Sequence, residues 1–151
     1  MTHLKEGDQA PDFSGPNQNG ETISLGDFKG QKLVIFFYPK DNTPTCTEEA
    51  CNLRDNYGLL KKNGYAIVGV SADSQRKHQN FIKKFDLPFP LIADTEQTML
   101  NAYGVWGEKQ MFGKKYMGIF RTTFVIDENG KIERIISKVT AKDHAAQILA
   151  A

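Results

Sequence analysis

The sequence has little cysteine, little net charge and no long apolar run. Its 151 residues contain only 2 cysteines, too few for a secreted scaffold held by several disulfides. The formal net charge is +1, so no strong electrostatic field draws in nucleic acid or an acidic membrane. The longest apolar stretch, Leu33 to Tyr38, is much shorter than the roughly 20 residues that span a bilayer. We therefore expect one globular domain, residues 1–151, without nucleic-acid or membrane partners.

Signals for secretion and for metal binding are also missing. The N-terminal residues 1–6 have neither the apolar core nor the cleavage site of a secretion signal, which favours a cytoplasmic location. Cysteines in that compartment are more often reduced and reactive than bridged. His3, His78 and His144 are widely spaced and form no metal-ligand pattern with the cysteines. We expect three solvated histidines, no metal and no cofactor.

What the sequence does contain is an alternation of strand and helix patterns. Lys32 to Tyr38 is a nearly continuous apolar run, typical of a central strand covered on both faces. Further strands are expected at 66–72, 91–93, 121–126 and 131–136, helices at 45–62, 74–87, 95–103 and 140–151, a short hairpin within residues 1–30, and an irregular loop at 104–118. Alternating units followed by an antiparallel hairpin imply an α/β protein with a central mixed sheet flanked by helices. A thioredoxin-like fold is a natural interpretation.

The chemically informative stretch runs from Pro39 to Arg54. Cys46 follows a polar loop and opens a predicted helix, whose unpaired N–H groups and partial positive charge favour a thiolate over a thiol. Thr43 can turn its hydroxyl toward the same place, and the proline at position 44 restricts the backbone between them. Because the thiolate is the nucleophilic form, this position favours a reactive Cys46 over a buried, inert one.

The string Thr43-Pro-Thr-Cys-Thr-Glu-Glu-Ala-Cys51 resembles a known active-site pattern. Pro39, Thr43 and Cys46 match the peroxiredoxin pattern Pro-x-x-x-Thr-x-x-Cys. The longer form, Thr-Pro-x-Cys-Thr-x-Glu-x-Cys, is similar to the peroxiredoxin Q group, also called bacterioferritin comigratory protein. The resemblance covers nearly the whole chain, because the chain also resembles the family's sequence at residues 10–13, 105–109, 118–119 and 121–127. Only the ending, 147–151, looks shorter than the family's last helix.

The resemblance implies a thiol-dependent peroxidase with divided roles. Cys46 would attack a hydroperoxide and become a sulfenic acid, and Cys51 would resolve that acid as an intramolecular disulfide. Thr43 would position the peroxide. Arg121 would support the thiolate and the developing negative charge, which suits a guanidinium with several hydrogen-bond donors.

Other positions carry over with less defined roles. Pro39 and Glu49 match positions at the family's substrate site, and Glu49 is the acidic residue between the two cysteines. Tyr38, just before the proline, can wall the same pocket. Arg54 is instead expected to pair with a carboxylate on the helix surface.

The spacing of the two cysteines has a geometric consequence. Five residues along an α-helix give a rise of about 7.5 Å, side chains about 140° apart and Cα atoms roughly 8–9 Å from each other. A disulfide needs Cα atoms within about 7 Å. The first turns of the helix must therefore unwind when Cys46 and Cys51 bond. Unwinding also exposes the disulfide to a reductant, for which the resemblance implies thioredoxin, and the resemblance favours a monomer.

Three other functions use similar residues. A thioredoxin-type disulfide exchanger uses Cys-x-x-Cys, whereas the spacing here is Cys-x-x-x-x-Cys. A redox sensor or chaperone-like binding protein would use the same disulfide as a switch, but would leave Thr43 and Arg121 without a purpose. A zinc-binding module would lack ligands. The predicted function is therefore a peroxidase acting on hydrogen peroxide and organic hydroperoxides.

Overall fold

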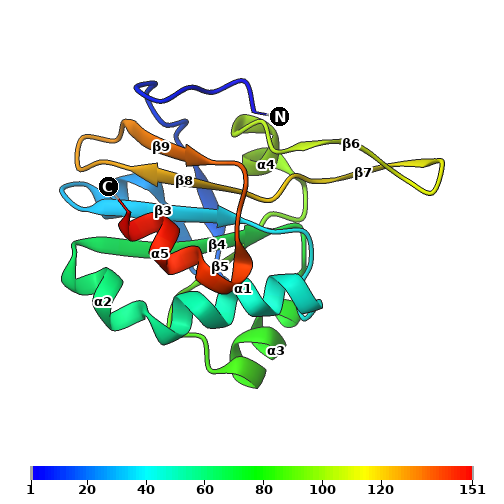
Figure 1. Ribbon diagram of the computed structural model, residues 1–151, viewed down its shortest axis with the longest axis horizontal. Helices are drawn as coiled ribbons and strands as arrows, with labels where there is room; N and C mark the ends of the chain where they lie inside the picture. The colour runs from blue at the N-terminus through cyan, green and yellow to red at the C-terminus, as the bar shows by residue number, and fades with distance from the viewer. Residues whose placement is uncertain (1, 151) are drawn as a thin grey trace.

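A five-stranded mixed sheet forms the centre of the computed structural model, which describes residues 2–150. In chain order the strands are β3 (Lys32–Phe37), β4 (Tyr65–Ser71), β5 (Leu91–Ala93), β8 (Thr122–Ile126) and β9 (Ile132–Ile136). Their spatial order is β5-β4-β3-β8-β9 (Figure 1). The first three strands run parallel, and β8 and β9 each run antiparallel to their neighbours. This confirms the predicted mixed sheet.

Helices pack around the sheet. They are α1 (Pro44–Asp55), α2 (Tyr57–Lys62), α3 (Gln75–Phe85), α4 (Thr98–Ala102) and α5 (His144–Leu149), with 3₁₀ turns at Leu25–Phe28 and Ala141–Asp143. Ser74 caps α3 as its pattern predicts, because the Ser74 hydroxyl accepts the N–H of Lys77 at 3.2 Å. In the part of the chain that the structure describes, no helix has both the length and the apolar character needed to cross a membrane.

The predicted helix over 45–62 is wrong in one respect, because two helices replace it. α1 ends at Asp55, and Asn56 has φ −110° and ψ 12°, outside the regular helical range. α2 begins at the next residue, Tyr57. The amide of Asn56 donates to the carbonyl of Asn52 at 2.8 Å, so its side chain competes for a carbonyl at the end of α1.

Two hairpins lie outside the central sheet. β1 (Ser14–Pro16) pairs with β2 (Thr22–Ser24), which confirms the predicted N-terminal hairpin. β6 (Trp106–Met111) pairs with β7 (Lys114–Ile119) in a ribbon that extends well away from the body of the molecule (Figure 1).

The ribbon overturns the prediction of an irregular loop at 104–118. Gly107 and Gly118 sit directly opposite each other in its ladder, and lysines fill several other positions. These residues hide the alternation of apolar and polar residues by which strands are recognised. Phe112 and Gly113, with φ of 52° and 78°, form the two-residue turn.

β3 separates two hydrophobic cores, because successive side chains of a strand point to opposite faces. Leu33, Ile35 and Phe37 belong to the first core, whereas Val34 and Phe36 belong to the second. All five are at most 1% exposed, which confirms that this strand is covered on both faces.

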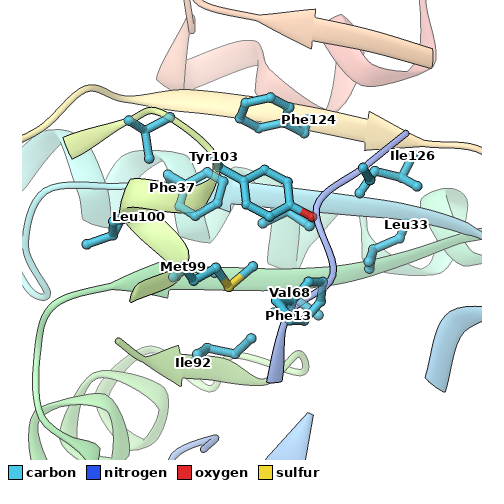
Figure 2. Close-up of a cluster of buried hydrophobic side chains, with 14 of the residues drawn as sticks. Phe13, Leu33, Phe37, Val68, Ile92, Met99, Leu100, Tyr103, Phe124 and Ile126 are labelled. Carbon is cyan, nitrogen blue, oxygen red and sulfur yellow. The ribbon is translucent and has the colours of Figure 1, made fainter. Parts of the chain in front are cut away.

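The first core holds a cluster of aromatic rings. Figure 2 shows Tyr103 beside Phe37 of β3 and Phe124 of β8. The ring centroid of Tyr103 lies 5.4 Å from that of Phe37 and 5.1 Å from that of Phe124, and these two lie 5.7 Å apart. Tyr103 is fully buried, and its hydroxyl donates to the carbonyl of Pro11 at 2.7 Å. The N-terminal segment and the region of α4 are thereby fixed against the sheet. The second core, between the sheet and α1, α2, α3 and α5, contains Cys46.

Candidate active site

The loop between β3 and α1 sets the position of Cys46. Thr43 occupies the N-cap of α1 in an extended conformation, with φ −96° and ψ 157°, and a proline follows as the first helical residue. The Thr43 hydroxyl donates to the carbonyl of Lys40 at 2.8 Å, which closes the loop and leaves the oxygen free to accept. Cys46 is the third residue of the helix, where N–H groups lack helical partners and the dipole favours an anion.

The inner face of α1 explains which side chains meet. Cys46, Glu49, Ala50 and Leu53 are its buried residues, a spacing of three and four that defines one helical face. Cys46 is only 2% exposed. Cys51 lies off this stripe and is half-buried. Both cysteines are free thiols on one regular helix, which confirms the premise of the spacing argument.

Arg121 reaches Cys46 because two strands pair. β8 runs antiparallel to β3 with Phe37 opposite Thr122, so the residue before Thr122 lies beside the end of β3. Nη2 of Arg121 donates to Sγ of Cys46 at 3.1 Å. Burial lowers the pKa of Arg121, but the negative charge of Glu49 and the contacts with Cys46 outweigh it and raise the pKa overall. The guanidinium is therefore a permanent positive charge at the sulfur.

Glu49 shares that guanidinium with the thiol. Its side chain is wholly buried, and Oε1 accepts from Nη1 of Arg121 at 2.6 Å. Its other oxygen, Oε2, is buried without a hydrogen-bond partner. Burial raises the pKa of Glu49 to about 7, against the opposing charge and hydrogen bond of Arg121. Cys46, Arg121 and Glu49, which the sequence analysis singled out separately, thus form one connected group.

His144 belongs to this group, and the prediction that it is a solvated surface residue is wrong. It is fully buried, with Nε2 at 2.7 Å from Oγ1 of Thr123 and 3.4 Å from Oε2 of Glu49, and Nδ1 at 2.8 Å from Oε1 of Gln147. Burial lowers its pKa; the Gln147 hydrogen bond opposes this and the charge of Arg121 adds to it.

A sequence signal for the burial of His144 exists. Ala141, Ala145 and Ile148 are all buried, and residue 144 lies on the same helical stripe. A histidine within an apolar stripe is placed to enter a core, whereas the search for metal-ligand spacing overlooks it.

His78 is likewise fully buried, so that prediction is wrong as well. Its Nδ1 lies 2.6 Å from Oδ2 of Asp41 and its Nε2 lies 2.9 Å from the carbonyl of Ile92. Oδ1 of Asp41 accepts from the hydroxyl of Tyr38 at 2.5 Å. Asp73 Oδ2 accepts the backbone N–H of Asp41 at 2.8 Å, so the cluster is satisfied internally. Only His3 is exposed as expected.

The side chain of Tyr38 contacts two groups of residues. Its ring packs in the same core as Cys46, while its hydroxyl points to Asp41. Burial raises the Tyr38 pKa well above its usual range, with the charge of Asp41 adding to the effect. The Tyr38 hydroxyl therefore stays protonated. It donates a hydrogen bond to Asp41 and does not act as a general acid. Pro39, next to it, is half-buried.

The surface side of α1 carries Cys51 and Arg54. Burial raises the pKa of Cys51; Arg54 lowers it and Asp55 raises it. Arg54 pairs with Asp55 at 2.9 Å, as predicted, and also donates to the carbonyl of Phe85 at 2.7 Å. Arg54 thus joins α1 to α3 and is not in the group around Cys46.

Lys109 is a further cation that sequence reasoning overlooked. It lies midway along the β6–β7 ribbon, opposite Tyr116, with Nζ 5.6 Å from the centre of the Phe120 ring. Burial lowers its pKa, and the charge of Arg121 adds to this while Cys46 opposes it. The lysine therefore shares the electrostatic environment of the Cys46 thiol.

Comparison with known proteins places this geometry in a family. The model of the AhpC/TSA family matches residues 6–135. Peroxiredoxin Bcp of Bacillus subtilis is 47% identical over 146 residues, which is 97% of this chain and 93% of that protein. Peroxiredoxin Bcp of Escherichia coli is 45% identical over 149 residues, 99% of this chain and 96% of that protein.

Solved structures agree with the sequence relatives. Peroxiredoxin Q of Xanthomonas campestris superposes with a TM-score of 0.88 at 36% identity, covering 99% of this chain and 94% of that one. Peroxiredoxin Q of Xylella fastidiosa superposes with a TM-score of 0.92 at 29% identity, covering 99% of this chain and 95% of that one. The predicted thioredoxin-like fold is confirmed by these neighbours. The chain therefore belongs to the AhpC/TSA family, within its peroxiredoxin Q group.

Proposed function

We propose that this thiol-dependent peroxidase works through Cys46 as the attacking thiolate, with Arg121 holding the charge and Cys51 resolving the product. The observation that carries the proposal is the 3.1 Å contact between Arg121 Nη2 and Cys46 Sγ at the first turn of α1. A permanent cation beside a sulfur favours the anionic form of that sulfur, and the anion is the nucleophilic form.

The first step forms one bond and breaks one. The Cys46 thiolate attacks one oxygen of ROOH, the O–O bond breaks, and sulfur is oxidised to a sulfenic acid while the peroxide is reduced to ROH. The negative charge passes from sulfur to the leaving oxygen, which takes up one proton. The guanidinium of Arg121 stabilises this charge during its transfer. Thr43, whose hydroxyl oxygen is free to accept, positions the peroxide, and Pro39 borders the place where it binds.

Cys51 acts in the second step. Its thiol attacks the sulfenic sulfur and releases water, leaving a Cys46–Cys51 disulfide. Because both residues lie on the regular helix α1, the first turns must unwind before the sulfurs can meet. The cost of unwinding strains the product and favours its reduction.

Substrate and partners follow from the same chemistry. A structure of the Xanthomonas campestris relative is described in terms of alkyl peroxide reduction. We propose organic hydroperoxides as well as hydrogen peroxide as substrates, and a thioredoxin-type dithiol protein as the reductant. We further propose a monomer that works in the cytoplasm.

The deciding experiment is turnover. Purified protein is supplied with thioredoxin, its reductase and NADPH, and consumption of NADPH is followed with hydrogen peroxide and with an organic hydroperoxide. Repeated turnover supports the proposal. Oxidation that stops after one equivalent with every dithiol reductant tested contradicts it and favours the redox-sensor alternative.

A further inference from the structure

The oxygen Oε2 of Glu49 is the starting point. It is buried, has no hydrogen-bond partner, and lies 3.4 Å from Nε2 of His144. An ionised carboxylate oxygen left in this state is strongly unfavourable, as any unpaired buried charge is. Something must lower that cost in the resting enzyme.

The neighbours of His144 determine which of its nitrogens carries hydrogen. Oε1 of Gln147 accepts the backbone N–H of Thr140 at 2.8 Å, and Nε2 of Gln147 donates to the carbonyl of Lys138 at 2.9 Å. These two bonds fix the orientation of the amide, so Oε1 faces Nδ1 of His144 as an acceptor. Nδ1 therefore carries a hydrogen. In a neutral imidazole Nε2 then carries only a lone pair, which can accept from the hydroxyl of Thr123 at 2.7 Å and has no hydrogen to offer Oε2 of Glu49.

A carboxylate beside a neutral His144 therefore leaves Oε2 of Glu49 without a donor in a dry interior, and one added proton on the pair removes this unpaired charge. It can reside on Oε2, or on Nε2 as an imidazolium that donates to Thr123 and faces the carboxylate. The raised pKa of Glu49 and the lowered pKa of His144 favour the first form. In both forms the pair binds one proton more than a carboxylate with a neutral imidazole.

The net charge on Cys46, Arg121 and the Glu49–His144 pair also indicates one bound proton. With Cys46 as thiolate and Arg121 as cation, these two charges cancel, and a bare Glu49 carboxylate would leave the buried group at −1. One proton on the Glu49–His144 pair makes it neutral. When Cys46 becomes an uncharged sulfenic acid, the same proton would leave the group at +1, and an ionised Glu49 would then balance Arg121.

We propose that Glu49 and His144 together hold one proton while Cys46 is a thiolate, and release it when oxidation removes the thiolate charge. This inference rests on the proposed function of Cys46. The balance is Cys–S⁻ + ROOH + H⁺ → Cys–SOH + ROH, in which the leaving oxygen needs one proton. The pair gives up one proton in the same step, so the protein and its substrate take up none from the medium. His144 acts through Glu49 and Arg121 and is a positioning residue.

Proton counting tests the proposal. The Cys51→Ser variant stops the reaction at the sulfenic acid with α1 intact. It is mixed with one equivalent of hydrogen peroxide in weakly buffered solution at about pH 6.5, just below the pH at which the pair would lose its proton unaided. A pH indicator follows proton uptake and a peroxide assay follows consumption. The Cys51→Ser protein, which is the parent in this test, should take up almost no protons. The double variant that also carries Glu49→Gln should take up about one proton per peroxide consumed.

Two further variants make the test specific. His144→Gln, whose amide can donate to Oε2 and keep Glu49 ionised throughout, should also take up about one proton. Glu48→Gln, which changes an exposed residue of the same helix, should behave as the parent. A carboxylic-acid C=O band in the infrared spectrum of the reduced parent should vanish in Glu49→Gln and persist in Glu48→Gln. A merely structural role for His144 would change neither the proton count nor this band.

The outcomes separate the two proposals. If no variant consumes peroxide, including the parent, the function of Cys46 fails. If peroxide is consumed and parent and Glu49→Gln take up the same number of protons, the function stands and the proton-holding pair is wrong. Absence of both the acid band and an imidazolium signal from His144, in a reduced parent whose Cys46 thiolate is seen by ultraviolet absorbance, also overturns the pair.

Discussion

The two buried histidines occupy contrasting environments. His78 lies between a carboxylate and a carbonyl, and the carboxylate of Asp41 is further satisfied by the hydroxyl of Tyr38. His144 faces the carboxylate of Glu49, one oxygen of which has no hydrogen bond. The first cluster is satisfied internally and holds the loop after β3. The second is incomplete and is connected through a guanidinium to the thiol.

The contrast teaches how to distinguish structural from functional burial of a histidine. Exposure is zero for both, so burial alone does not separate them. What separates them is an acceptor that lacks a donor, because such an oxygen makes the protonation state depend on its neighbours. We therefore expect changes in the Glu49–His144 group to alter reactivity, and changes in the Asp41–His78 cluster to alter stability.

The largest expected effect lies at the thiol itself. Cys46→Ser should abolish peroxidase turnover, because no other group on the inner face of α1 can be the attacking thiolate. Coupled NADPH oxidation measures this. Cys51→Ser is the matched variant and should still consume about one equivalent of peroxide, with sulfenic or more oxidised Cys46 visible by mass spectrometry. Turnover of more than a few per cent in Cys46→Ser would remove Cys46 from its role.

Arg121→Ala should slow peroxide attack by about 100- to 1,000-fold, the usual effect of removing one donor from a developing negative charge. The rate of oxidation by a limiting amount of peroxide measures it. The pH midpoint of Cys46 alkylation should also rise, since a cation at 3.1 Å favours the thiolate. Arg54→Ala, which removes a cation on the other side of α1, is the control and should leave both quantities near the parent values. Equal alkylation profiles for Arg121→Ala and the parent would contradict the assignment.

Glu49 should make stability fall as pH rises. Its folded pKa of about 7 lies above the ordinary value of 4.5, so between these values the unfolded chain loses a proton that the native state keeps. The free energy of unfolding therefore falls from about pH 4.5 to 7, by on the order of 3 kcal/mol in total, and the loss is complete above the folded pKa. Urea unfolding across this range should show a slope that Glu49→Gln removes. An unchanged slope in the variant would mean that Glu49 is ionised in the native state at acid pH.

Tyr38→Phe should have the smallest effect, and on stability alone. It leaves Oδ1 of Asp41 without its donor, which costs about 1 to 2 kcal/mol for a buried acceptor. Chemical denaturation measures the loss. The thiol alkylation profile should match that of the parent, because the hydroxyl points away from the group around Cys46. A shifted profile would show that the two clusters are coupled and would break the distinction drawn between them.

Local chemistry was predictable from the sequence where a short motif carried it. The positions of Cys46 and Arg121 on their elements follow from the strand pattern and the helix start, and the mixed sheet follows from the alternation of elements. The partners of His78 and His144 were not predictable, because they lie 14 to 95 residues away along the chain, although the apolar stripe around residue 144 indicates that His144 is buried. The β6–β7 ribbon was also missed, since its glycine and lysine content gives no period-2 signal.

Asn52 lies beside Cys51, and its side chain sets a boundary on how far α1 can come apart. Its amide donates to the carbonyl of Lys142 at 2.6 Å and its oxygen accepts the N–H of Ala145 at 2.8 Å, so it clamps α1 to the C-terminal segment. A disulfide at the preceding residue pulls directly on this clamp. If the clamp holds, amide exchange on oxidation should quicken only from residue 45 to 51. If the clamp breaks, amide exchange should quicken in the last helix, α5, as well. The order of the C-terminal segment would then depend on whether the thiols are reduced or oxidised.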